Sequence, residues 1–282
     1  MPELPEVETV RRGIEARVVG RKIGAVEVGR ERSVRRVGRE AVIHGLTGAT
    51  VLNARRRGKY LLCDLDTGDE MMIHLRMSGR VLVEPSGTAR PKHTHVVLPL
   101  SPRDGVADEM WFVDPRTFGE VVVYDPANTA DVLPELARLG VDPICDPFDA
   151  GILAARLHGR RGALKPLLLN QHIVAGIGNI YADEVLHRAG LRWDRTPDSL
   201  NSKKMAMLAS CIVDILSAAI ASGGSTLTDT QYVDIEGNVG SFQEQHRVYG
   251  REGEGCLTCG KGSIRRTMVA GRATSYCPRC QR

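Results

Sequence analysis

Hydrophobic and polar positions follow two different patterns along the chain, which divide it into a β-rich first part and a helical second part. The first thirteen residues mix apolar and charged positions as a helix does, with Pro2 and Pro5 at its start, where proline is tolerated. From about residue 22 to 125, short β-rich runs are separated by Gly, Pro and Asp turns. This spacing predicts a sandwich or a barrel, with strands over 23–28, 60–65, 71–75 and 121–124.

The second part of the chain predicts helices. Residues 126–150 carry four prolines, which is typical of a linker, here with one short helix over 131–139. Apolar residues at helical spacing predict helices over 148–157, 164–170, 179–189 and 199–221. Residues 222–242 are rich in Gly, Ser and Thr and predict a mobile loop. We therefore expect four segments: a β-sandwich domain at 1–125, a linker at 126–150, a helical domain at 151–243 and a cysteine-bearing module at 248–282.

Composition narrows the class of protein. The chain has 282 residues, of which 42% are hydrophobic, so it can bury a core and is not a disordered chain. No run of 18 apolar residues is present, and the N-terminal segment has no apolar signal core. We expect a cytoplasmic protein without a membrane partner.

Basic residues are concentrated in two places although the net charge is only +4. Residues 244–282 hold eight Lys and Arg against three acids, and Arg55, Arg56, Arg57 and Lys59 form a second cluster. Local basic density of this kind suits a polyanion such as nucleic acid. One cluster alone would fit a solvated surface equally well.

Four of the seven cysteines have the spacing of a metal site. Cys256 and Cys259 form one CxxC pair, Cys277 and Cys280 form another, and 17 residues separate the pairs. This pattern is typical of a structural zinc site with four thiolates, and it leaves no open position for catalysis. A disulfide pair or a redox CxxC is the less favoured alternative. Cys63, Cys145 and Cys211 lie among apolar residues and are expected to be buried.

The N-terminus holds a candidate nucleophile. Met1 precedes Pro2, and removal of a methionine before a small residue would expose the proline as a free secondary amine. An N-terminal amine titrates at about 8, so it is a usable nucleophile near neutral pH and can form a Schiff base. Taken alone, the segment fits an ordinary helix start better.

Seven ordered motifs then show a resemblance that covers essentially the whole chain. They are Met-Pro-Glu-Leu-Pro-Glu-Val-Glu-Thr at 1–9, Arg-Arg-Gly-Lys-Tyr-Leu at 56–61, His-Leu-Arg-Met-Ser-Gly at 74–79, Lys-His-Thr-His-Val at 92–96, Asp-Pro-Arg-Thr-Phe-Gly at 114–119, Gly-Ile-Gly-Asn-Ile-Tyr-Ala-Asp-Glu at 176–184 and Val-Tyr-Gly-Arg-Glu-Gly at 248–253, followed by the closing CxxC pairs. The chain resembles the formamidopyrimidine-DNA glycosylase family, the bacterial 8-oxoguanine repair enzymes.

The resemblance implies a fold and an activity. The fold is α+β, with an N-terminal helix and a β-sandwich domain, then a helical domain that carries a helix–two-turn–helix feature and a zinc ribbon. The activity is that of a bifunctional DNA glycosylase and AP lyase of base excision repair. Such an enzyme removes oxidised purines through a Schiff base on Pro2 and then cuts the strand by β,δ-elimination. It acts as a monomer on damaged double-stranded DNA near the bacterial nucleoid, with one structural Zn²⁺.

The resemblance also implies roles for single residues. Glu3 would protonate the ribose ring oxygen, Lys59 would contact the phosphate beside the lesion and assist β-elimination, and Arg272, at the tip of a β-ribbon, would hold phosphate and assist the second elimination. The enzyme must also pull its target base out of the stack and fill the gap. The residues expected to contact the DNA backbone are His93, Arg116, Arg160 and Asn179, and those expected to fill the gap are Met77, Arg116 and Phe118.

Two departures and two alternatives stay open. Arg76 stands where the family commonly has Gly, and Thr117 where a second Arg is common, so the opposite-base preference is open. Residues 226–242 are expected to cap the flipped base. One alternative is a glycosylase of the sister family that prefers oxidised pyrimidines, which Leu4 and the Asp-Pro-Arg-Thr-Phe motif at 114–118 disfavour. The other is a non-catalytic zinc-ribbon protein that binds damaged DNA.

Overall fold

The structure is a computed structural model that describes residues 1–227 and 232–282, and the chain forms two compact units. Unit 1 comprises Met1–Arg138 and Ser222–Ser241, and unit 2 comprises Leu139–Ala221 and Phe242–Arg282. Residues 222–241, which the sequence pattern groups with the helices, therefore pack in the same unit as the sandwich. Residues 228–231 of the expected capping loop lie outside the described residues.

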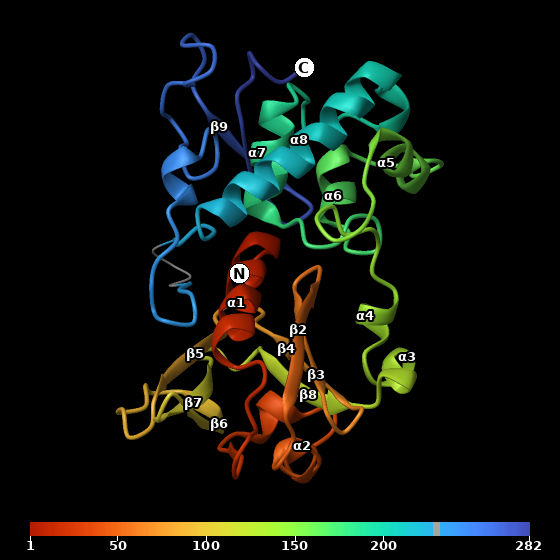
Figure 1. The fold of residues 1–282 in the computed structure, drawn as a ribbon. Helices are drawn as coiled ribbons and strands as arrows, with labels where there is room; N and C mark the ends of the chain where they lie inside the picture. The colour runs from red at the N-terminus through yellow and green to blue at the C-terminus, as the bar shows by residue number, and fades with distance from the viewer. Residues whose placement is uncertain (228–231) are drawn as a thin grey trace. The chain divides into compact units, whose positions relative to one another are not determined.

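Unit 1 is built mainly from antiparallel strands. Figure 1 labels most of its elements, which are α1 (Leu4–Arg17), β1 (Glu27–Val28), a 3-10 turn (Glu31–Val34), α2 (Arg39–Leu46), β2 (Val51–Arg57), β3 (Tyr60–Leu65), β4 (Glu70–His74), β5 (Arg80–Pro85), β6 (Thr94–Arg103), β7 (Val106–Val113), β8 (Glu120–Tyr124), a second 3-10 turn (Pro126–Asn128), α3 (Thr129–Val132) and α4 (Pro134–Ala137).

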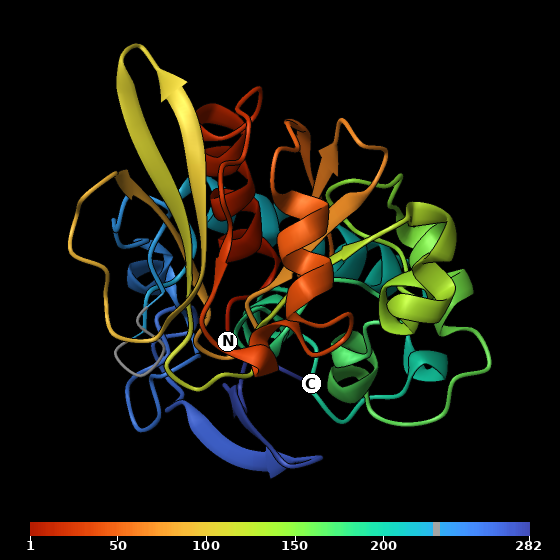
Figure 2. The ribbon, with the colours of Figure 1, turned by 90° about the horizontal axis from the view of Figure 1, so that it is seen from below.

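Two four-stranded sheets form the sandwich. Their strand orders are β1-β6-β7-β5 and β2-β3-β4-β8, and each neighbouring pair is antiparallel. Figure 2 shows β6 and β7 side by side as a long hairpin. One apolar core takes side chains from both sheets and from α1, among them Leu61, Ile73, Phe112 and Val10. Each such side chain contributes about 1.5–3 kcal/mol on burial, so the core holds the two sheets and the helix together.

The returning segment 232–235 completes that core. Tyr232 and Ile235 are 2% exposed, and the Ile235 carbonyl accepts a hydrogen bond from the Val83 amide at 2.9 Å. A Cβ on Gly13 of α1 would lie 2.5 Å from the side chain of Ile235, so glycine permits the close approach. Asp234 then accepts the amides of Glu236 and Asn238, each at 2.9 Å. These described parts of the Gly/Ser/Thr-rich segment are therefore held by hydrogen bonds, where the sequence predicted mobility.

Unit 2 is helical and ends in a two-stranded ribbon. Its elements are α5 (Ala150–Leu157), α6 (Leu164–Leu169), α7 (Asn179–Arg188), a 3-10 turn (Pro197–Ser199), α8 (Ser202–Ala221), a further 3-10 turn (Phe242–Gln245), β9 (Arg265–Val269) and β10 (Arg272–Tyr276). The predicted α+β fold, with its sandwich, its helical domain and its ribbon, is confirmed.

Several boundaries differ from the predictions for local reasons. The predicted helix at 131–139 is two four-residue helices, because Pro134 disfavours helical backbone at Leu133, which has φ −132° and ψ 61°. In the run 23–28 only Glu27–Val28 forms a strand, while Ile23 makes an isolated bridge to Leu100. The helix α2 was not predicted.

Two further predictions concern burial. Cys63 and Cys211 are buried as expected, but Cys145 is exposed, so that prediction was wrong. It lies in a turn where the Asp142 carboxylate accepts the Cys145 amide at 3.2 Å, and the turn faces its side chain outward.

The helix α8 has the length and apolar content of a membrane span, but half of its most apolar window is buried. It packs on α5 and α7, as the core helix of a domain does.

We predict that Gly79→Ala destabilises unit 1. A Cβ at this position would lie 2.5 Å from the carbonyl oxygen and 3.0 Å from the Cα of Leu75, and backbone atoms cannot move aside cheaply. The free energy of unfolding should fall by about 1–3 kcal/mol, measured by urea denaturation. The control is Gly29→Ala, whose new Cβ would meet the carbonyl oxygens of His95 at 3.7 Å and Thr94 at 3.8 Å, which are ordinary van der Waals contacts. Equal midpoints for the two variants would contradict the prediction.

Candidate active site

The head of α1 is a buried, tightly bonded helix start. Pro2 is buried, and Glu3, 3% exposed, is the N-cap residue that forms a capping box with Glu6. The Glu6 carboxylate accepts the amide of Glu3 at 2.8 Å and that of Ser225 at 2.7 Å. Helix N-termini favour negative charge because their first amides lack partners within the helix. Pro2 therefore lies next to the fixed carboxyl group of Glu3, and its nitrogen, which is in the peptide bond to Met1 here, would become a secondary amine on removal of Met1.

The position of the Glu6 side chain also accounts for the glycine at position 224. Gly224 has φ +80°, and a Cβ there would lie 2.7 Å from Oε1 of Glu6. The Tyr232 hydroxyl donates to the Glu6 carbonyl at 3.2 Å. Glu6 thus ties two residues to the helix that follows Pro2: Ser225 through its carboxylate and Tyr232 through its carbonyl. The sequence analysis missed this residue, although an acid three positions after a capping acid is the signal of a capping box.

Lys59 lies at the tip of the β2–β3 hairpin. Arg57 and Tyr60 pair across a two-residue turn whose first central residue, Gly58, has φ +56°. Glycine is preferred in that position because most side chains disfavour positive φ. Lys59 is only 6% exposed, and the ring of Tyr60 lies edge-on to His74 with their centroids 4.5 Å apart. Burial and then the charges of Arg76 and Lys59 lower the pKa of His74, so this histidine is neutral at pH 7.

The proposed gap-filling residues lie on two loops joined through Asp114. The Asp114 carboxylate accepts the Ser78 hydroxyl at 2.5 Å, the Arg116 amide at 3.2 Å and the Gly119 amide at 2.7 Å. The structure therefore brings the loop of Met77 next to the loop of Arg116 and Phe118. Met77 is 37% exposed and Phe118 39% exposed, so neither is a core residue. The guanidinium carbon of Arg116 lies 5.1 Å from the centre of the Phe118 ring.

His93 is also hydrogen-bonded to Asp114, which joins the two loops. Its carbonyl accepts the Asp114 amide at 3.0 Å, and its ring lies 6.2 Å from that of His95. His95 in turn contacts the Asp114 carbonyl at 2.8 Å through Nε2. Half-buried His93 has φ +70°, a left-handed backbone that is costly for a side-chain-bearing residue. These bonds compensate for that backbone.

Both departures from the family pattern fall on left-handed backbone. Arg76 has φ +52° and Thr117 has φ +55°, a left-handed backbone that favours glycine. Arg76 donates to the buried carboxylate of Glu120 at 3.3 Å, where Arg36 also donates at 2.6 Å. Nε of Arg76 is buried without a hydrogen-bond partner among the described residues. Arg76 therefore keeps an unused donor beside Met77.

In unit 2, a buried ion pair fixes the ribbon to the helices. Nζ of Lys165 lies 2.7 Å from Oδ1 of Asp183 and donates to the Ala273 carbonyl at 2.9 Å. The other oxygen of Asp183 accepts the Ser275 amide at 2.8 Å. Burial raises the pKa of Asp183 to about 7 against the opposing effect of Lys165. The pair holds the backbone of β10 immediately after Arg272, which is exposed.

Asn179 and Arg160 are the other predicted contacts of unit 2. Asn179 is the first residue of α7, and its side-chain amide donates to the Ala273 carbonyl at 3.0 Å. The structure thus joins Asn179 to the ribbon next to Arg272, while its Oδ1 is buried without a hydrogen-bond partner among the described residues. Arg160 is exposed in the turn after α5. The sequence analysis missed Lys165 and Asp183, whose pairing depends on a fold that brings α6 and α7 together.

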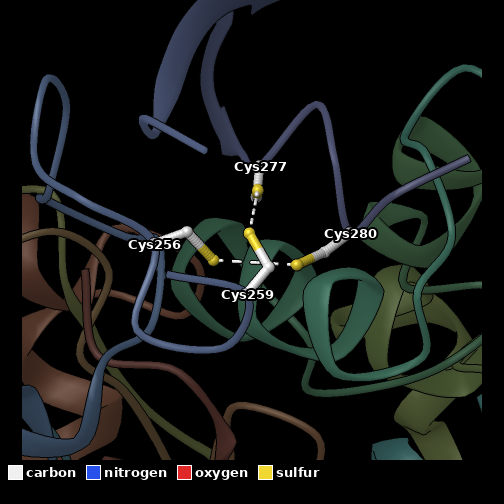
Figure 3. Close-up of side chains that lie close together, drawn as sticks. All are labelled: Cys256, Cys259, Cys277 and Cys280. Atoms are coloured by element: carbon white, nitrogen blue, oxygen red, sulfur yellow. Dashed lines mark hydrogen bonds between the residues drawn. The ribbon is translucent and has the colours of Figure 1, made fainter. Parts of the chain in front are cut away.

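The four predicted cysteines converge, as Figure 3 shows. Sγ of Cys256 lies 3.7 Å from Sγ of Cys280, Sγ of Cys259 lies 3.8 Å from Sγ of Cys277, and all four sulfurs lie within 4.8 Å of one another. A tetrahedral ion with bonds of about 2.3 Å to sulfur requires sulfur–sulfur separations of about 3.8 Å. The cluster could therefore hold a metal ion. Nε2 of His187 contacts the sulfur of Cys256 at 3.7 Å, a neighbour that the sequence analysis missed.

Comparisons with known proteins place the chain in one family. Residues 1–121 match the family model for the formamidopyrimidine-DNA glycosylase N-terminal domain, and residues 139–231 match the model for its H2TH domain. Curated proteins called formamidopyrimidine-DNA glycosylase from Cereibacter sphaeroides (strain ATCC 17025 / ATH 2.4.3) and Desulfitobacterium hafniense (strain DSM 10664 / DCB-2) are 45% and 40% identical, over 100% of this chain and of each relative.

Solved structures agree. Lactococcus lactis Fpg in complex with DNA that contains an abasic site has a TM-score of 0.88 and 35% identity, over 99% of both chains. A point mutant of that protein with DNA that contains Fapy-dG has a TM-score of 0.89 and 35% identity, over 100% of both chains. Matches of this extent in sequence and in structure show that the chain belongs to the formamidopyrimidine-DNA glycosylase family.

Proposed function

We propose that the chain is a bifunctional DNA glycosylase and AP lyase of base excision repair that removes oxidised purines from duplex DNA. Family membership makes it a DNA glycosylase. The observation that carries the proposed mechanism is the head of α1, where Pro2 is buried next to the N-cap carboxyl group of Glu3. A protein that only binds DNA has no need for a proline amine beside a fixed acid.

Pro2 would act as the nucleophile after Met1 is removed. Its nitrogen lone pair forms a bond to C1′ of the damaged nucleotide, and the glycosidic bond breaks with its electron pair on the departing base. The proline nitrogen then loses its proton, the departing base takes one up, and the nitrogen regains a lone pair. Glu3 gives a proton to the ribose ring oxygen, the ring opens, and the nitrogen lone pair completes the iminium at C1′. The iminium acidifies the C2′ protons. Loss of one such proton expels the 3′-phosphate, and a second elimination expels the 5′-phosphate.

The remaining proposed residues hold the DNA. Lys59, on the hairpin tip, would contact the phosphate beside the lesion and assist the first elimination, and Arg272 would hold phosphate during the second. Exposed Met77 and Phe118 suit the gap left by a flipped base, and Arg116 can donate to the orphaned partner base. Backbone contacts are proposed for His93, Arg116, Arg160 and Asn179. The N-terminus of α7, where Asn179 lies, suits a phosphate.

Substrate and metal are part of the same proposal. One relative's DNA contains Fapy-dG, an oxidised guanine product, and Leu4 and the motif at 114–119 favour the purine branch over the pyrimidine branch. We assign Zn²⁺ to the four cysteines, because four clustered thiolates match its preference and leave no open position. The ion would stabilise the ribbon that carries Arg272. We also propose that the enzyme acts as a monomer in the bacterial cytoplasm, and that residues 226–242 cap the flipped base.

The first test is covalent trapping. Borohydride treatment with duplex DNA that contains one 8-oxoguanine opposite cytosine should link the DNA to Pro2, and mass spectrometry should show the N-terminal peptide without Met1. Glu3→Gln should slow base release by about 10²–10⁴-fold. A protein with one extra residue retained before Pro2 should give no adduct. Tight binding without an adduct on oxidised-purine and oxidised-pyrimidine duplexes, with Met1 removed, would instead support the binding-protein alternative.

Zinc removal should affect the ribbon of unit 2 and leave the fold of unit 1 intact. The two tryptophans provide the readout, because Trp111 lies in the core of unit 1 and Trp193 in unit 2. In a Trp193→Phe background, chelation should abolish DNA binding and leave the Trp111 emission unchanged, since the metal contributes folding energy only to the ribbon. Full DNA affinity in metal-free protein would refute the assignment, and loss of the Trp111 signal would show that the sandwich also depends on zinc.

Arg272→Ala should reduce the salt dependence of DNA binding. Each lost phosphate contact lowers the slope of log K against log salt by about 0.9. Arg266→Ala on the neighbouring strand is the matched control, because Arg266 is also exposed but pairs with Glu252 at 3.7 Å. The two slopes, measured by fluorescence anisotropy between low and moderate salt, should differ. Equal slopes would contradict a phosphate contact at Arg272.

A further inference from the structure

Arg56 is a buried cation whose contacts join α1 to the hairpin tip. Its side chain is 0% exposed. Nε donates to Oε2 of Glu8 in α1 at 3.1 Å, and Nη1 donates to the carbonyl of Gly58 at 2.9 Å. One guanidinium therefore bonds at the same time to the helix that begins at Pro2 and Glu3 and to the turn that carries Lys59.

Glu8 is suited to hold this cation. Burial alone would raise its pKa, but Arg11 and Arg56 outweigh that effect and hold the pKa below its usual value. The carboxylate is therefore ionised at neutral pH. It also accepts hydrogen bonds from Arg11 and Arg12, both at 3.1 Å, which lie one helical turn further along α1. Bonds from three arginines fix the carboxylate in place.

Stability alone does not account for a buried pair of this kind. Removing two charges from water costs several kcal/mol for each ion, and apolar residues of similar volume often stabilise a protein equally well or better. What apolar residues could not supply is a donor for the Gly58 carbonyl. The pair therefore contributes a directed bond to one particular peptide group.

That peptide group is the one that leads into Lys59. The carbonyl of Gly58 and the amide of Lys59 belong to one rigid plane, so holding the oxygen fixes the direction in which the chain enters Lys59. Gly58 has φ +56°, and glycine gives the turn more backbone freedom than any other residue. The bond from Arg56 removes that freedom where the position of a lysine is proposed to matter.

We propose that the Glu8–Arg56 pair is a strut that sets the position of Lys59 relative to the head of α1, which makes Arg56 a positioning residue for the reaction. The inference rests on the proposed role of Lys59. Arg56 itself is fully buried and does not touch substrate. A small displacement of a catalytic group is enough to slow a reaction by roughly tenfold to a hundredfold, so loss of the strut should slow the reaction without removing any group that meets the DNA.

The test is a double-mutant cycle between the strut and Lys59. The strut is removed by combining Glu8→Gln with Arg56→Met, which leaves no buried unpaired charge. Single-turnover rates of base release and of strand cleavage are measured for this variant, for Lys59→Met and for the combination. The strut variant should slow the same step as Lys59→Met by roughly tenfold or more. The combination should be no slower than Lys59→Met alone, because a missing lysine cannot be mispositioned.

The double-mutant cycle distinguishes failure of the positioning role of Arg56 from failure of the proposed role of Lys59. A strut variant at the wild-type rate, or a combination whose losses multiply, overturns the positioning role and leaves the role of Lys59 intact. Wild-type rates for Lys59→Met would instead overturn the proposed function of Lys59, and the inference with it. Arg12→Met removes another partner of Glu8 but, with its side chain 58% exposed, should stay within about twofold of the wild type.

Folding is checked separately. Trp111 emission and the midpoint of thermal unfolding show whether unit 1 of the strut variant is intact. Where it is not, Arg56→Lys in the presence of Glu8 is used, because lysine keeps the charge but lacks the fork that bonds two acceptors at once. This variant should also slow the step that depends on Lys59. An unchanged rate in a folded Arg56→Lys protein overturns the proposal.

Discussion

Buried carboxylates that accept backbone amides are the interaction that holds the loops of the proposed DNA contacts in place within each unit. Glu6 accepts the amides of Glu3 and Ser225, and Asp114 accepts those of Arg116 and Gly119. In unit 2, Asp183 accepts an amide of β10, and Glu184 accepts the three successive amides of residues 247–249 at 2.8–3.0 Å. Charge-assisted bonds of this type are short and strong, and a buried acceptor without them would be costly.

These carboxylates solve a problem that follows from where the functional groups lie. The proposed DNA contacts are on turns and element ends, which in most proteins are the most mobile parts of the chain. A loop positions a side chain only when its backbone amides are held from inside. Each buried acid described above lies within a few residues of a proposed contact or bonds directly to its loop. The hydrogen bonds of these acids therefore hold the loop backbone in a fixed position relative to the strands and helices. The bond from Arg56 to Gly58 holds the backbone of the β2–β3 turn in the same way.

The sequence predicted what local patterns encode. The helices α5 to α8 and several strands follow from apolar periodicity, and the cysteine spacing predicted a cluster that the structure forms. The motif residues Pro2, Glu3, Lys59 and Arg272 were predicted through resemblance, and their roles stay predictions, as does the four-segment domain division. The partners of those residues could not be predicted. Lys165 meets Asp183, and Arg56 meets Glu8, only because the fold joins distant segments, and no spacing along the chain reports such a contact.

Residues with a strained, left-handed backbone lie near the same proposed DNA contacts as the buried acids. Among the described residues, five that are not glycine have positive φ, namely Arg76, His93, Asp104, Thr117 and Ala270. Four of these lie within two residues of a proposed DNA contact or are one themselves. Left-handed backbone costs about 1–2 kcal/mol for a residue with a Cβ, and strain of this kind persists only where surrounding bonds determine the conformation. The hydrogen bonds of Asp114 hold His93 and Thr117 in place, and the carboxylate of Glu120 holds Arg76. Loops that fold for stability alone need no residue with a Cβ at such positions, so the retained strain is consistent with the DNA contacts proposed for the side chains beside it.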